Sequence, residues 1–142
     1  MHFVSEILAR KGRHIYSIHP RQSVLDAIQE MDVREVGALL VIEHEKLLGI
    51  ISERDYARRG ILRGRRSDST LVEEIMTTEL ICTAGTETLD ACMELMTEKR
   101  VRHLPVLDDG KVIGVLSIGD LLNAIMVRQR STIEELTHYI EG

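Results

Sequence analysis

The order of apolar and polar residues divides the chain into short extended segments and amphipathic helices. Apolar residues recur at helical spacing in two places, at Val24, Ile28 and Met31, and at Leu89, Cys92, Met93 and Met96. This spacing predicts a helix in each place. Four apolar runs predict strands, at Ala38–Ile42, Leu47–Ile51, Leu104–Leu107 and Lys111–Leu116. Polar turns, EHEK and DDGK, join these strands in pairs and are short enough for hairpins.

The same series of elements occurs twice, which indicates a duplication. Segments 36–55 and 101–120 align at an offset of 65 residues, and seven of the twenty positions are identical: Val36/Val101, Leu39/Leu104, Val41/Val106, Lys46/Lys111, Gly49/Gly114, Ser52/Ser117 and Asp55/Asp120. An extended segment precedes each first helix, at 15–18 and at 80–83, and a second helix is expected to begin at Ser52 and at Ser117. Upstream, residues 5–8 echo residues 73–76. Each copy is therefore predicted to be a β-α-β-β-α unit of about 50 residues.

A single unit would leave one sheet face and two helical stripes poorly covered. We therefore expect an α/β (α+β) fold in which the two pseudo-symmetric repeats pack face to face. The expected organisation is repeat one at 4–59, a polar linker at 60–69, repeat two at 70–127 and a helical tail at 128–142. Ser131 and Glu134 resemble a capping box, which predicts a separate terminal helix over Thr132–Ile140. The apolar face of that helix needs a partner, either the body of the chain or a second subunit.

Composition excludes several classes of protein. The 142 residues carry a formal net charge of −5 and contain one Phe, three Tyr and no Trp. An acidic chain with so few aromatic rings is poorly suited to stack or track nucleic acid. The longest apolar run, 36–42, is too short to span a membrane, so a cytoplasmic protein is expected. Cys82 and Cys92 form no CxxC motif, and the histidines show no HxxxH or HExxH spacing, so we expect reduced thiols and no metal site.

The sequence Gly-h-h-Ser-x-x-Asp, where h is apolar, ends both hairpins and is the motif that can carry chemistry. It comprises Ser52 and Asp55 in the first copy and Ser117 and Asp120 in the second. One interpretation is a capping box at a helix start. The other is a grip for a nucleoside monophosphate, in which helix amides and the Ser hydroxyl meet the phosphate and the carboxylate accepts the ribose hydroxyls. Arg54 would add a cation for phosphate.

The two motifs, together with Arg-His-Leu-Pro-Val at 102–106, make the chain resemble a CBS-domain pair, also called a Bateman module, over residues 4 to 127. Segment 52–58 and the tail ending His138-Tyr139-Ile140 further resemble stand-alone bacterial proteins of this kind. The resemblance implies two clefts that bind adenine nucleotides, with AMP as first choice and ADP, ATP, NAD or S-adenosylmethionine as further candidates. It also implies a homodimer and a regulatory role without catalysis, exerted on an effector protein that the sequence does not name.

Carried over residue by residue, the resemblance implies the following ligand-binding set: His19, Val36, Gly37, Ala38, Ser52, Arg54, Asp55, Thr83, Val101, Arg102, His103, Ser117, Gly119 and Asp120. Asp55 and Asp120 match the ribose-binding acids. His19 and Thr83 match the residue that ends the first strand of each repeat. Because Gly119 replaces Arg54, and Arg102 and His103 replace Gly37 and Ala38, the two clefts are expected to differ.

Two other functions remain as alternatives. The five arginines between Arg58 and Arg66 can be a surface for nucleic acid or an acidic partner, or merely a solvated linker, and we favour the linker. A small nucleotide hydrolase is a weaker alternative, since the chain has no P-loop, nucleophile elbow or metal triad.

Overall fold

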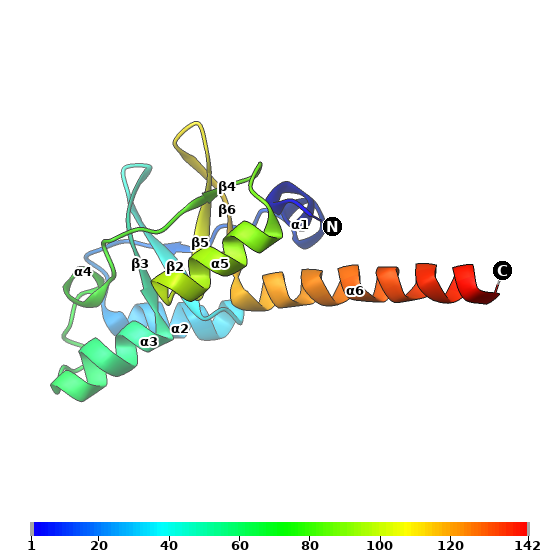
Figure 1. Ribbon diagram of the computed structural model, residues 1–142. Helices are drawn as coiled ribbons and strands as arrows, with labels where there is room; N and C mark the ends of the chain where they lie inside the picture. Colours follow the sequence, from blue (N-terminus) through cyan, green and yellow to red (C-terminus); the bar gives the residue numbers. More distant parts are fainter. Residues whose placement is uncertain (1, 142) are drawn as a thin grey trace. The chain divides into compact units, whose positions relative to one another are not determined.

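The computed structural model describes residues 2–141, without the side chain of Glu141. It contains two three-stranded sheets, of order β1-β2-β3 and β4-β5-β6. In the first, β1 (Ser17–Ile18) runs parallel to β2 (Ala38–Glu43), which forms an antiparallel hairpin with β3 (Lys46–Ser52). In the second, β4 (Thr83–Ala84), β5 (His103–Asp108) and β6 (Lys111–Ser117) repeat this arrangement. The predicted α/β fold with a duplicated unit is confirmed (Figure 1).

The two hairpins share their local chemistry as well as their order. Each has a two-residue turn with both residues at positive φ, His44 and Glu45 in one and Asp109 and Gly110 in the other. Such turns match the right-handed twist of the strands that they join. Each hairpin also has a shift in register at equivalent places, after Val41 and after Val106.

The helix before each hairpin begins and ends in the same way in both copies. Helix α2 (Val24–Arg34) begins after Ser23, whose hydroxyl accepts a hydrogen bond from Asp26 N, and α5 (Leu89–Lys99) begins after Thr88, which accepts from Ala91 N. Each ends on a residue in the left-handed region, Glu35 and Arg100. The buried faces of the helices, which include Met31 in α2 and Met96 in α5, lie in two separate hydrophobic clusters.

The chain folds into two compact units that exchange the leading segments of the repeats. One unit joins the first 14 residues to the chain from Ile81 onward, and the other contains Ile15–Leu80. Helix α1 (Val4–Lys11), at the start of repeat one, therefore packs in the cluster of repeat two, where Leu8 is buried. The short helix α4 (Val72–Ile75), at the start of repeat two, packs in the cluster of repeat one. The echo between residues 5–8 and 73–76 thus reflects two segments with corresponding places in the two units.

Three local expectations differ from the structure. The first strands, predicted at 15–18 and 80–83, are shorter and in the second repeat shifted, since only Ser17–Ile18 and Thr83–Ala84 pair with their parallel neighbours. After α3 (Glu53–Asp55), a π-helical turn (Tyr56–Gly60) and a 3-10 turn (Ile61–Arg63) carry helical backbone into the segment predicted as a linker.

The separate terminal helix predicted over Thr132–Ile140 is wrong. A single helix, α6, runs from Ile118 to Glu141. Residues 118–141 contain no proline and, beyond Gly119, no glycine, so no helix-breaking residue interrupts the helix. The Thr132 hydroxyl donates to Arg128 O at 3.0 Å within the helix rather than capping a new one. In the described residues, no helix is both long and apolar enough to cross a membrane.

Candidate functional site

The Ser-x-x-Asp motif lies at the junction between the hairpin and the next helix in both units, and in both it is a capping box. Ser52 Oγ accepts from Asp55 N at 3.1 Å, and Asp55 Oδ2 accepts from Ser52 N at 2.9 Å. In the second copy Ser117 Oγ accepts from Asp120 N at 3.1 Å, and Asp120 Oδ2 accepts from Ser117 N at 2.8 Å. The structural interpretation of the motif is therefore confirmed, and any ligand must bind to side chains that already hold the helix start.

Backbone contacts bring the segment before each hairpin to the same junction. The amide of Glu53 donates to Gly37 O at 3.1 Å, and the amide of Ile118 donates to Arg102 O at 2.9 Å. Strand register places Ala38 opposite Ser52, and His103 opposite Ser117. The structure thus gathers one group in each unit: Val36, Gly37, Ala38, Ser52, Arg54 and Asp55 in the first, and Val101, Arg102, His103, Ser117, Gly119 and Asp120 in the second.

His19 lies away from the first group. It follows β1, which runs alongside Leu40 and Val41, so it reaches the hairpin end of the sheet. His19 Nε2 is 3.5 Å from Glu43 Oε1, and Arg21 donates to the same carboxylate. The hydrogen bond from Arg21 lowers the pKa of Glu43. Strand β2 rises about 13 Å between Ala38, which lies opposite Ser52, and the hairpin end where His19 lies. This length of strand separates His19 from Ser52 and Asp55.

Thr83 is not the structural counterpart of His19. Thr83 lies opposite Val106 in the second sheet, and Ile18 lies opposite Val41 in the first. Because Val41 and Val106 are equivalent positions of the two repeats, Thr83 corresponds to Ile18. A shift of one residue reverses the face of a strand. Thr83 is accordingly buried, with Oγ1 3.4 Å from Cys92 Sγ. Burial raises the pKa of the Cys92 thiol, and the hydrogen bond with Thr83 partly opposes that rise.

The two acids of the motif have different additional partners. Asp55 Oδ1 accepts from the hydroxyl of Thr77 at 3.0 Å, and its Oδ2 accepts from Ser52 Oγ at 3.0 Å. Asp120 Oδ2 instead accepts from Lys11 Nζ at 2.5 Å, and the same ammonium group donates to Val115 O at 2.6 Å. One acid is therefore bound to a neutral hydroxyl and the other to a cation.

Lys11 and Thr77 are not among the ligand-binding residues predicted from the sequence. Both come from the leading segments that the units exchange, Lys11 from α1 and Thr77 from the residues just after α4. The echo between residues 5–8 and 73–76 marked these segments as equivalent. It did not indicate on which repeat each segment packs.

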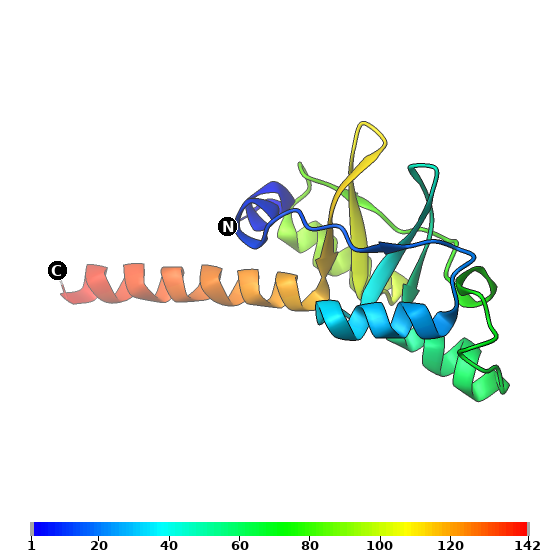
Figure 2. The ribbon, with the colours of Figure 1, turned by 180° about the vertical axis from the view of Figure 1, so that it is seen from behind.

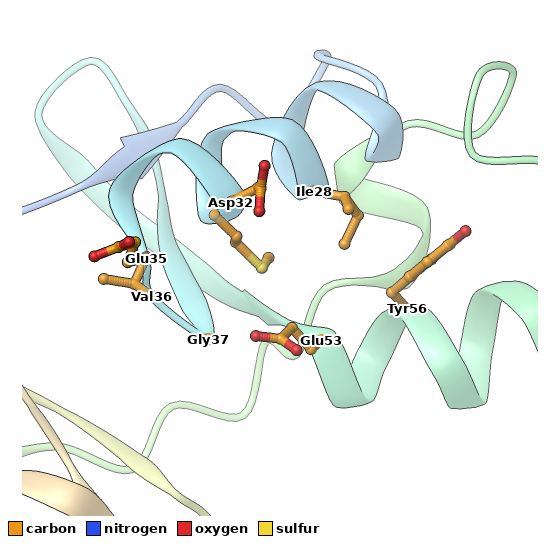
Figure 3. A pocket seen from close by; sticks show the side chains of 8 residues that line it. Ile28, Asp32, Glu35, Val36, Gly37, Glu53 and Tyr56 are labelled. Atoms are coloured by element: carbon orange, nitrogen blue, oxygen red, sulfur yellow. The ribbon is translucent and has the colours of Figure 1, made fainter.

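A cavity of about 580 Å³ opens beside the first group, between the end of α2 and the start of α3 (Figure 3). Its lining is Ile28, Met31, Asp32, Glu35, Val36, Gly37, Glu53 and Tyr56. Of the predicted ligand residues it includes Val36 and Gly37. In Figure 3 Ile28 and Tyr56 lie toward one end, Glu35 lies toward the other, and Asp32 and Glu53 lie between them. The polar part of this lining is therefore acidic, which the candidate residues alone did not reveal.

The arginine-rich segment is largely occupied by contacts within its own unit. Arg59 Nη1 donates to Met76 O at 3.0 Å, Arg65 lies 3.7 Å from Glu74, and Arg66 pairs with Asp68 at 2.9 Å. Three of the five arginines therefore have partners in the chain. This pattern favours a structural linker over a continuous surface for a phosphate backbone.

Known proteins match both repeats. The model of the CBS domain family matches residues 4–61 and 72–127. A mitochondrial CBS domain-containing protein of Arabidopsis thaliana, CBSX3, is 44% identical over 126 residues, which are 84% of this chain and 61% of that protein. The CBS domain-containing protein YhcV of Bacillus subtilis is 33% identical over 107 residues, 75% of this chain and 76% of that protein. This chain thus spans about three fifths of the length of its plant relative.

Solved structures match the fold as well. A putative signal-transduction protein with CBS domains from Burkholderia ambifaria is 46% identical with a TM-score of 0.86, covering 89% of this chain and 96% of that one. The CBS domain pair of protein MJ0100, solved in complex with 5′-methylthioadenosine and S-adenosyl-L-methionine, shares the fold at 24% identity and a TM-score of 0.78, covering 89% of this chain and 97% of that one.

Proposed function

The chain belongs to the CBS-domain family, as a tandem pair, and from this premise we propose that it is a regulatory module that binds an adenine nucleotide without transforming it. The observation that carries the proposal is the repeated Ser-x-x-Asp junction. In each unit it presents a serine hydroxyl and a carboxylate beside the backbone of the segment that enters the hairpin. The adenosine ligands of the MJ0100 domain pair support this class of ligand.

The two groups do not offer the same environment to a phosphate. Beside Asp120 lie Lys11 and, at the start of the hairpin, Arg102 and His103. Beside Asp55 lies one cation of the motif, Arg54, but the adjoining cavity contributes three acids, Asp32, Glu35 and Glu53. Carboxylates repel a phosphate, whereas an ammonium and a guanidinium attract it. We therefore place the tighter phosphate-bearing ligand at the Asp120 group.

Ribose recognition follows from the lone pairs that the carboxylates retain. A carboxylate has about four acceptor positions on its two oxygens. Asp120 uses Oδ2 for Ser117 N and Lys11, so Oδ1 can accept from a ribose hydroxyl. Asp55 already accepts on both oxygens. AMP is our first choice of ligand, as the family resemblance suggests; ADP, ATP and NAD remain candidates.

A regulatory role requires that the ligand bind one conformation more tightly than another. We propose that the pair works as a homodimer whose arrangement depends on the bound nucleotide, and that an effector protein responds to it. The proposed location is the cytoplasm, because Cys82 and Cys92 are both free thiols, as expected in a reducing compartment.

Isothermal titration calorimetry with AMP, ADP, ATP and NAD tests the proposal. We expect AMP to bind, and Asp120→Asn to weaken that binding by about 10-fold or more, the effect of losing one hydrogen bond to a charged group. Asp109→Asn is the matched control, because this exposed acid occupies the turn of the same hairpin and asparagine accepts positive φ.

Thermal unfolding of each variant separates loss of the ligand contact from loss of the helix cap. The absence of heat with wild-type protein at millimolar concentrations of all four nucleotides would refute nucleotide binding. Equal affinities for wild type, Asp120→Asn and Asp55→Asn would instead show that a nucleotide binds elsewhere.

A further inference from the structure

Helix α6 has two apolar stripes that point in different directions. The first consists of Leu121 and Ala124, which are 0% and 2% exposed and belong to the hydrophobic cluster of their unit. Arg128 extends this stripe and pairs with Asp90 of α5 at 3.2 Å. Beyond Arg128 the stripe becomes polar, and every described side chain from Gln129 to Ile140 is exposed. In Figures 1 and 2 the helix accordingly continues well past the start of α5.

The second stripe continues along the whole helix and stays exposed. Its members are Leu122, Met126, Gln129, Ile133, Leu136 and Ile140. The five apolar side chains are 48%, 50%, 62%, 58% and 81% exposed in that order. The stripe lies about 130° around the helix from the direction shared by Leu121 and Ala124, so the body of the unit does not cover it. An apolar surface of this extent, repeated turn after turn, is the usual sign of a binding surface.

The spacing of the stripe specifies the partner. Successive members are separated by four, three, four, three and four residues. This alternation is the a/d repeat of a coiled coil, which places Met126, Ile133 and Ile140 at a positions and Leu122, Gln129 and Leu136 at d positions. A stripe that packs on a globular surface is wider and has a period of 3.6 residues, whereas an a/d seam fits another helix with the same repeat.

We propose that α6 pairs with α6 of a second copy of the chain as a parallel, two-stranded coiled coil. Isoleucine at a together with leucine at d favours two parallel strands. Gln129 supports the same arrangement. In a parallel pair it faces its own twin, and the two amides can donate and accept mutually. In an antiparallel pair it would face an apolar residue. The proposal does not rest on nucleotide binding.

Oxidative cross-linking of the full-length protein tests the orientation. Gln129→Cys should form a covalent dimer, because identical d positions of a parallel pair approach within the range of a disulfide. Glu135→Cys is the matched control, since it lies on the opposite side of the helix and should stay monomeric on a denaturing gel. Wild-type protein controls for Cys82 and Cys92. Failure of Gln129→Cys to cross-link while the protein is dimeric would overturn the parallel coiled coil.

Sedimentation equilibrium of two charge variants tests the seam itself. Leu136→Glu places a charge at a d position, and His138→Glu places the same charge on the far side of the same turn. Both residues are exposed, so neither change should unfold the unit, which circular dichroism checks. We expect Leu136→Glu to raise the dimer dissociation constant about 100-fold or more, and His138→Glu to leave it unchanged. Equal dissociation constants for Leu136→Glu and wild type would refute the proposal, whether that common state is a monomer or a dimer held elsewhere.

Discussion

Replacing Gly49 by alanine should destabilise the protein, because the structure leaves no room for a methyl group there. A Cβ atom at this position would lie 2.6 Å from the carbonyl oxygen of Thr77 and 3.0 Å from Met76 Sδ. The Thr77 backbone is held in place, because its amide and carbonyl exchange hydrogen bonds of 2.8 and 3.0 Å with Ile50. Its hydroxyl also donates to Asp55. The methyl group must therefore push the segment after α4 away from β3.

The size of the effect follows from these contacts. Overpacking costs about 1–3 kcal/mol, and each weakened backbone hydrogen bond adds about 0.5–1.5 kcal/mol. The lower conformational freedom of alanine in the unfolded chain offsets about 0.4–1 kcal/mol. We expect a net loss of about 2–4 kcal/mol in the free energy of unfolding, which moves the urea midpoint down by about 1–2 M.

Gly114→Ala is the matched control, at the equivalent position of repeat two. Its Cβ would lie 2.7 Å from Leu8 Cδ2, the end of a flexible side chain and not a backbone atom. Rotation of Leu8 can relieve part of this clash, so the expected loss is about 1–2 kcal/mol. Urea unfolding followed by circular dichroism compares the two variants. A Gly49→Ala midpoint at or above that of Gly114→Ala would refute the reasoning.

Two further predictions concern contacts that join elements within a unit. Arg59→Ala should lower the free energy of unfolding by about 1 kcal/mol, because Arg59 donates a hydrogen bond to Met76 O. The control Arg58→Ala should change it by less than about 0.5 kcal/mol. Urea unfolding measures both variants, and equal effects would contradict the role of Arg59. The hydrogen bond from Arg128 lowers the pKa of Asp90, so this pair contributes stability above the unfolded-state pKa of about 3.9 and loses it as the pH falls through the folded-state pKa. Arg128→Gln should return the Asp90 pKa toward its ordinary value in an NMR titration, and an unchanged pKa would show that the pair does not form in solution.

The longer elements could be predicted from the sequence because local pattern determines them. The four strands of the hairpins and the helices α2 and α5 occur where apolar spacing placed them. The starts of β1 and β4 could not be placed in this way. A two-residue strand has too few positions to show a period, and its register depends on the parallel neighbour. The continuous helix α6 shows the converse, because Ser131 and Glu134 could begin a new helix only if the backbone at the N-cap left the helical conformation, and here it stays helical.

The sequence predicted the motif residues of the candidate site but not the residues that surround them. Repetition of Ser-x-x-Asp identified Asp55 and Asp120, but contacts over 22 and 109 residues bring Thr77 and Lys11 to these acids. The two units exchange the leading segments of the repeats, so the residue that completes each junction comes from the start of the other repeat. Within the motif only Arg54 and Gly119 suggested unequal sites. Most of the difference in charge is outside it, in Lys11 beside Asp120 and in the acids that line the cavity near Asp55. A duplicated motif can therefore form two sites of different preference without a change in the motif itself, because the surrounding segments determine the charge that a ligand meets.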